Sequence, residues 1–125
     1  MNIGDTNKIA FIIGERTSRD LRAVSIYVGG ELITYDDNVA YVPQFIHSIE
    51  CEAADLEQRN ISNEYFFLNW GATTDGVSAR GLLEGDHLRL NATLGNGKLI
   101  EITLSIKYVI SIYREAANAL RELHA

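Results

Sequence analysis

Residues 86–104, with the sequence DHLRLNATLGNGKLIEITL, decide the fold class of this 125-residue chain. On both sides of Gly95-Asn96-Gly97, apolar and polar side chains alternate, which is the pattern of two half-buried β-strands joined by a tight turn. The alternation predicts an antiparallel hairpin that turns one face toward a hydrophobic core. The residues expected on this core face are Leu88, Leu90, Ala92, Leu94, Ile100, Ile102 and Leu104.

Two amphipathic helices are predicted outside this hairpin, over residues 42–59 and 106–124. Pro43 suits the first turn of the earlier helix, where a missing N–H costs no hydrogen bond. Ser105 is the predicted N-cap of the later helix, because its hydroxyl can accept a bond from a free backbone N–H. The buried stripe expected on the earlier helix comprises Phe45, Ile46, Ile49, Ala53 and Leu56.

The remaining predicted strands are short apolar or alternating segments. A second hairpin turn is predicted at Gly29-Gly30, since two glycines tolerate the positive φ angles that such turns need. The segments are residues 8–13, 21–28, 31–35 and 65–68, with a short piece at 82–83. We therefore predict an α+β fold in one domain over residues 1–125, in the order β-β-β-α-β-β-β-α. An antiparallel sheet of about six strands carries two helices on one face.

The charge balance limits the classes of partner. A formal charge of −6 argues against direct nucleic-acid binding, which needs a clustered basic surface. An acidic balance serves solubility in most proteins, and it also suits a basic protein partner, because complementary fields speed encounter. Both interpretations stay open on composition alone. No apolar run approaches the roughly 18 residues of a membrane span, so we expect no membrane association.

The cysteine content and the first residues point to a cytoplasmic protein. Cys51 is the single cysteine, so no internal disulfide is expected and a reducing compartment fits. The first eight residues include Asp5 and lack the basic-then-apolar order of a secretory signal.

Signals of catalysis are weak in this sequence. His47 and Cys51 stand four residues apart on the first predicted helix and therefore share a face. Such a pair occurs in metal sites and beside thiol nucleophiles, but no second ligand pair follows at metal spacing. We therefore predict that both residues are structural, buried or at the rim of the core, and we expect no metal and no cofactor.

Acidic residues gather on the first predicted helix and in the loop before it. The helix carries Glu50, Glu52, Asp55 and Glu57, and the loop carries Asp36 and Asp37. Such charges usually form a solvated face. The functional interpretation is a negative rim that meets a basic partner.

Residues 71–85 form a polar connection with several glycines, longer than a hairpin needs. The simplest role for Asp75 in it is to bond local backbone N–H groups in a turn. With Trp70 just before the connection, Asp75 is also a candidate contact for a partner.

Several short segments are similar to bacterial immunity proteins. They are DNVAYVP at residues 37–43, NWG at 69–71, TDGVSA at 74–79 and GD at 85–86. Over roughly residues 26–113 the chain resembles immunity proteins of polymorphic-toxin and contact-dependent growth inhibition systems, in particular the immunity 42 family. The resemblance implies a cytoplasmic antitoxin that binds one cognate toxin domain and needs no catalytic group. If the toxin is a nuclease, its basic surface is complementary to an acidic patch.

Three functions are therefore open: an immunity protein, a small enzyme that uses His47, Cys51 or Asp75, and a structural adaptor domain. We favour the immunity protein, without enzymatic activity. The residues predicted to contact a toxin are Glu50, Glu52, Asp55, Glu57, Asp36, Asp37, Trp70 and Asp75.

Overall fold

The computed structural model describes residues 1–35 and 37–124. Its elements are β1 (Asn2–Gly4), β2 (Ile9–Arg16), β3 (Leu21–Val28), β4 (Glu31–Leu32), β5 (Val39–Tyr41), α1 (Val42–Glu57), a 3-10 turn η1 (Ala72–Thr74), β6 (Ser78–Glu84), β7 (His87–Thr93), β8 (Leu99–Ser105) and α2 (Ile106–Leu123). The α+β class and the alternation of strand groups with single helices are confirmed. β1 and β5 are additions that the sequence did not predict.

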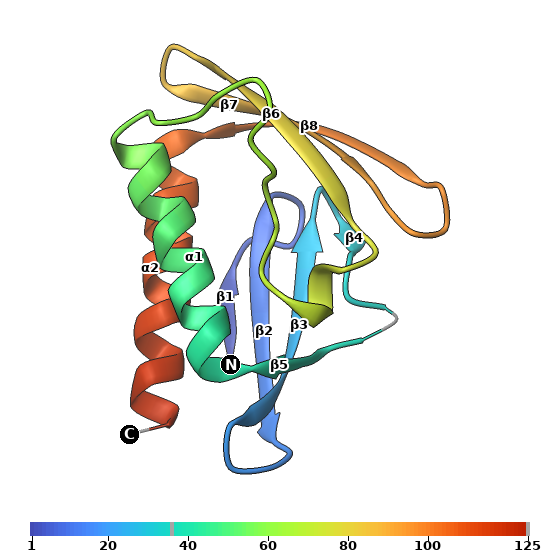
Figure 1. Ribbon diagram of the computed structural model, residues 1–125, viewed down its shortest axis with the longest axis vertical. Helices are drawn as coiled ribbons and strands as arrows, with labels where there is room; N and C mark the ends of the chain where they lie inside the picture. The colour runs from blue at the N-terminus through green and yellow to red at the C-terminus, as the bar shows by residue number, and fades with distance from the viewer. Residues whose placement is uncertain (36, 125) are drawn as a thin grey trace.

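The strands form two antiparallel sheets rather than one. In the first sheet β1, β2 and β3 pair in order, and β3 pairs with β4 near one end and with β5 near the other. The second sheet has the order β6-β7-β8 and lies across one end of the first (Figure 1). The prediction of a single sheet fails here because alternation identifies hairpins but not which hairpins pair with each other.

The hairpin at residues 86–104 is confirmed. Leu88 lies opposite Leu104, Leu90 opposite Ile102, and Ala92 opposite Ile100, so the predicted apolar side chains share one face. Asn96 Oδ1 accepts the N–H of Lys98 at 3.0 Å in the turn. The turn between β3 and β4 is also confirmed, with φ angles of +59° and +85° at its two glycines.

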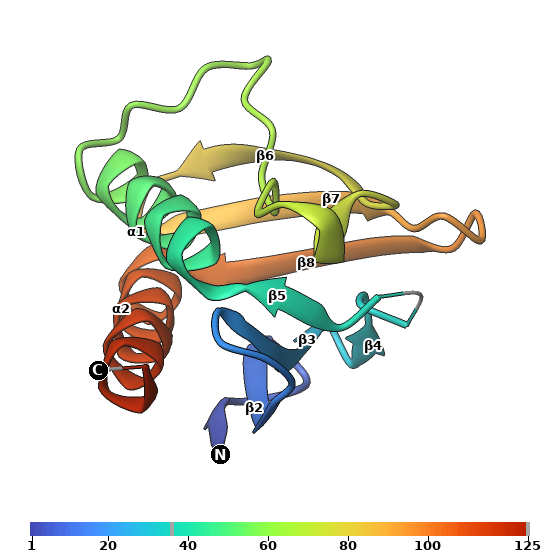
Figure 2. The same ribbon diagram turned by 60° about the horizontal axis from the view of Figure 1, so that its bottom comes forward.

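The segment before this hairpin differs from the prediction. β6 is a full strand whose seven residues all pair with β7, whereas only a short piece at 82–83 was expected. The strand predicted at residues 65–68 is reduced to one bridge between Phe67 and Ala79. Consequently the connection after α1 runs as an extended loop, clearly visible in Figure 2, before the chain enters the second sheet.

The helices agree with the sequence within two residues at their ends. Pro43 lies in the first turn of α1, and Ser105 Oγ accepts the N–H of Tyr108 at 3.3 Å as the cap of α2. The two helices lie side by side and pack against the sheets from one side (Figure 1). Among the described residues, no helix combines the length and the apolar character that crossing a membrane requires.

Candidate partner-binding site

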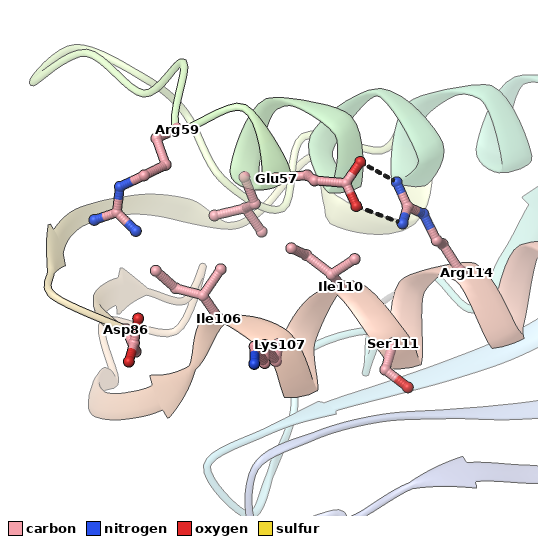
Figure 3. Close-up of a pocket in the computed structure, with 9 residues that line it drawn as sticks. Glu57, Arg59, Asp86, Ile106, Lys107, Ile110, Ser111 and Arg114 are labelled. Carbon is pink, nitrogen blue, oxygen red and sulfur yellow. Dashed lines mark hydrogen bonds and ion pairs between the residues drawn. The ribbon is translucent and has the colours of Figure 1, made fainter.

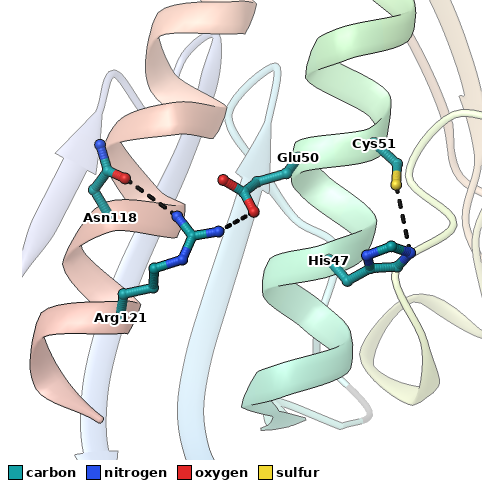
Figure 4. Close-up of polar contacts among 5 residues, drawn as sticks. All are labelled: His47, Glu50, Cys51, Asn118 and Arg121. Atoms are coloured by element: carbon teal, nitrogen blue, oxygen red, sulfur yellow. Dashed lines mark hydrogen bonds and ion pairs between the residues drawn. The ribbon is translucent and has the colours of Figure 1, made fainter. Parts of the chain in front are cut away.

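Two carboxylates of α1 are held by arginines of α2. Glu57 makes a bidentate ion pair with Arg114, with N–O distances of 2.8 and 3.0 Å (Figure 3). Glu50 of α1 pairs with Arg121 of α2 (Figure 4). The negative charge of both residues is therefore largely balanced within the molecule.

Asp55 is also used within the fold. The Tyr65 hydroxyl donates a hydrogen bond of 2.8 Å to Asp55 Oδ2. This bond ties the loop after α1 back onto the helix. The nearby carboxylate and burial together raise the pKa of Tyr65, burial being the larger cause, so the hydroxyl keeps its proton.

Glu52 is buried, with only 3 % of its surface exposed, so the expectation that it lies on the helix surface is wrong. Its Oε1 accepts the backbone N–H of Leu68 at 3.0 Å. Burial raises the pKa of Glu52 to about 7, although Tyr113, the Leu68 N–H and Trp70 nearby lower it in part. A carboxyl group that titrates near neutrality inside the core is thus a structural feature of α1 and not part of its surface.

The bond from Leu68 fixes a strained point of the chain. Leu68 has a φ of +58°, in the left-handed region that a branched side chain rarely adopts. Glu52 holds this residue where the loop after α1 turns into the core. Glu52 Oε2 and the neighbouring Trp70 Nε1 both lack a hydrogen-bond partner among the described residues. The hydrogen-bonding capacity of the polar groups around Glu52 is therefore only partly used within the described residues.

Trp70 belongs to the core, so the expectation of an accessible contact residue is wrong for it as well. The residue is 1 % exposed. Its ring lies 5.5 Å from that of Phe11, 5.9 Å from Phe45 and 5.2 Å from Tyr113, measured between centroids. The pairs with Phe45 and Tyr113 are edge-to-face and the pair with Phe11 is tilted, and this packing anchors the loop that carries Trp70 against β2 and the two helices.

Asp37 and Asp75 are brought together although they are distant in sequence. Both line a small cavity of about 180 Å³, which we call the loop pocket. Its lining residues are Ile33, Tyr35, Asp37, Thr73, Asp75, Gly76 and Gly95. Asp36, also predicted to contact a partner, lies outside the described residues.

The turn beside the loop pocket is closed by Thr74 rather than by Asp75. Thr74 Oγ1 accepts the N–H of Trp70 at 2.9 Å, and the Thr74 N–H donates to the carbonyl of Gly71 at 3.1 Å. Asp75 is exposed at the end of this turn. The Asp75 carboxylate therefore lies at the surface of a turn that the hydrogen bonds of Thr74 stabilise.

A larger cavity of about 470 Å³, the helix-end pocket, lies between the C-terminal end of α1 and the N-terminal end of α2 (Figure 3). Leu56, Ile106 and Ile110 supply its apolar lining. Its charged and polar lining consists of Glu57, Arg59, Asp86, Lys107, Ser111 and Arg114. Sequence reasoning missed this pocket because its basic residues are scattered along the chain.

Arg59 stands at a strained position beside the helix-end pocket. Its φ is +55° at the position after the α1 cap, where glycine is the usual residue. The Arg59 N–H donates to the carbonyl of Leu56 at 3.1 Å and the Asn60 N–H to that of Asp55 at 2.8 Å. These two bonds are the hydrogen-bond pattern of a Schellman motif.

His47 and Cys51 share a face of α1 as predicted, with 3.5 Å between Cys51 Sγ and His47 Nε2 (Figure 4). Both are exposed, so the expected burial or placement at the core rim is wrong. Neither lines the loop pocket or the helix-end pocket. Within residues 1–35 and 37–124, no group of three or more His, Cys, Asp or Glu residues is arranged to hold a metal ion.

Comparison with known proteins gives a match in structure but none in sequence. No family model matches the chain, so the resemblance to the immunity 42 family stays a prediction. No curated protein matches it either. The fold is similar to that in the crystal structure of CdiI from Burkholderia dolosa AUO158, with a TM-score of 0.68 and 12 % sequence identity. The similarity covers 95 % of this chain and 99 % of that chain.

At 12 % identity the similarity to CdiI establishes a shared fold, and it extends over nearly the whole of both chains. Both sheets and both helices of this protein therefore belong to one arrangement that CdiI also has. The side chains of the two pockets are properties of this chain.

Proposed function

We propose that this protein is an immunity protein of a contact-dependent growth inhibition system. It binds one cognate toxin domain in the cytoplasm and neutralises it by covering the toxin's active site. The observation that carries the proposal is the fold shared with CdiI, an immunity protein of such a system, over 95 % of this chain. The short segments that resemble immunity proteins support the same function independently of the fold.

The protein acts by binding and not by catalysis in this proposal. Its net charge of −6 favours encounter with a basic toxin, because complementary fields raise association rates. A nuclease toxin suits this best, since a surface that binds nucleic acid is basic.

The direct test is protection of a sensitive bacterium. The toxin domain encoded beside this gene is expressed alone, with this protein, and with an unrelated immunity protein as the control. We expect growth to recover only with this protein, and the purified pair to form a stable complex. Growth arrest that persists, together with no complex in solution, would contradict the proposal.

The same assay separates binding from catalysis. His47→Ala and Cys51→Ala are expected to protect as well as the wild type, because both side chains are exposed and line neither pocket. Loss of protection with unchanged folding and unchanged toxin binding would instead favour a small enzyme built on this pair.

A further inference from the structure

The loop pocket contains a buried hydroxyl group that nothing in the described chain satisfies. Thr73 is 5 % exposed and lines the pocket. Its Oγ1 has no hydrogen-bond partner among the described residues. Buried polar atoms nearly always have a partner, so a hydroxyl without one beside a cavity leaves a hydrogen-bond position open to a water molecule or to a group from outside the chain.

Two carboxylates line the same pocket. Asp37 Oδ1 accepts the N–H of Val39 at 2.9 Å, and the residues that the structure describes make no hydrogen bond to its second carboxylate oxygen. Asp75 is exposed at the end of the η1 turn. The seven lining residues include no lysine, arginine or histidine. The pocket therefore presents hydrogen-bond acceptors and negative charge without an internal counter-ion in its lining.

The volume of the loop pocket suits a single side chain of a partner better than a small-molecule ligand. Its volume of about 180 Å³ is below the roughly 300–1,000 Å³ of typical ligand sites. Ile33 supplies an apolar part of the wall, and Tyr35 lines the pocket beside it. Long basic side chains bury their methylene stems against such walls and keep the charged end among polar groups.

We propose that the loop pocket receives an arginine side chain of the cognate toxin. A guanidinium has five N–H donors in a planar fork, enough to bond two carboxylates and the Thr73 hydroxyl together. Charged hydrogen bonds of this kind are stronger than neutral ones, so the contact would be an anchor of the interface. The proposal rests on the proposed function, because it names the toxin group that the immunity protein recognises.

Three conservative variants isolate the groups concerned. Asp37→Asn keeps an oxygen that can accept the Val39 N–H, and Asp75→Asn removes charge at similar size. Thr73→Val replaces the hydroxyl with a methyl group of the same shape. Because that hydroxyl has no internal partner, Thr73→Val should leave the protein as stable as before or more so. Glu115→Gln, at an exposed position of α2, is the matched control for the loss of one charge.

The pocket is tested first without the toxin, by NMR titration of the full chain with N-acetyl-arginine amide. N-acetyl-citrulline amide, equal in shape but uncharged, is the control probe, and N-acetyl-lysine amide tests whether a point charge suffices. We expect weak, saturable shifts of the amides of Thr73, Gly76 and Gly95 with the arginine probe only. The Asp37→Asn/Asp75→Asn variant should lose them and Glu115→Gln should keep them. Absent shifts, equal shifts with citrulline, or stronger binding of the lysine probe would overturn the assignment to arginine.

Binding of the toxin domain encoded beside the gene separates this proposal from the proposed function. We expect Asp37→Asn/Asp75→Asn to bind roughly 30-fold or more weakly, mainly through faster dissociation. We expect Thr73→Val to bind more weakly without loss of stability. If the wild type binds and both variants bind equally well, the pocket proposal is wrong while the immunity function stands. If the wild type does not bind the toxin, the proposed function itself fails.

Discussion

The carboxylates of α1 and those of the loop pocket differ in what surrounds them. On α1, Glu50 and Glu57 are paired with arginines, Asp55 accepts from Tyr65, and Glu52 is buried. In the loop pocket, Asp37 and Asp75 share a lining that contains no basic residue. The density of acidic residues in a sequence therefore does not locate the negative charge that the fold leaves unbalanced. The carboxylates without a basic residue in their lining are those of the loop pocket.

The largest loss of stability is expected from reversing the charge of Glu52, the buried acidic residue of α1. Glu52→Lys removes the acceptor of the Leu68 N–H and places an ammonium beside that N–H group and the Trp70 side chain. An uncompensated buried charge costs about 3–5 kcal/mol, a large part of a domain's stability. We expect loss of the folded state in circular dichroism and urea denaturation. Glu115→Lys, on the exposed face of α2, is the control, and a Glu52→Lys protein with a wild-type unfolding midpoint would show that Glu52 is not internal.

The second effect is a pH dependence of stability that the buried carboxyl group of Glu52 introduces. Burial raises the pKa of Glu52 from 4.5 to about 7 in the folded protein. Between these values the folded state holds a proton that the unfolded state releases, so stability falls as pH rises through this window. This shift of the Glu52 pKa corresponds to roughly 3 kcal/mol in the free energy of unfolding. That stabilisation is fully present below pH 4.5 and is lost above pH 7.

Glu52→Gln removes this titration while keeping an oxygen for the Leu68 N–H. Urea denaturation of wild type and variant at pH 5 and pH 8 measures the effect. We expect the variant to gain stability relative to the wild type as the pH rises. A difference between the two proteins that is the same at both pH values would show that the Glu52 pKa is not raised by folding.

A smaller effect tests whether Asp55 is used within the fold. Tyr65→Phe removes the hydroxyl that donates to Asp55 and should cost about 1 kcal/mol. Tyr41→Phe, at a residue that is 52 % exposed, is the matched control and should change stability little. Equal unfolding free energies for the two variants would mean that the Tyr65 bond contributes nothing measurable.

The fold was predictable where local chemistry determines it. Glycine turns at residues 29–30 and 95–97, the Ser105 cap and the alternating strands of the second hairpin all follow from neighbours in sequence. β1 and β5 have three residues each and exist through pairing with β2 and β3. Segments this short carry no period of their own, so only the folded chain reveals them.

The placement of Glu52 was within reach of the sequence, whereas the pockets were not. Glu52 follows Ile49 by three residues and precedes Leu56 by four, which is the spacing of the buried stripe of α1. Because Glu52 is charged, it was assigned to the helix surface although its spacing matches that of the buried stripe. The meeting of Asp37 with Asp75 depends on how two loops and the β7–β8 turn approach, and no sequence period encodes that.

The most direct test of the central claim compares the two carboxylate groups in one binding experiment with the cognate toxin domain. Asp37→Asn/Asp75→Asn removes two charges at the loop pocket, and Glu50→Gln/Glu57→Gln removes two on α1 that arginines already balance. We expect the first variant to dissociate roughly 30-fold faster or more, and the second to keep nearly wild-type affinity. Weak binding by the α1 variant with unchanged binding by the pocket variant would contradict the account, and would place the toxin on the acidic helix.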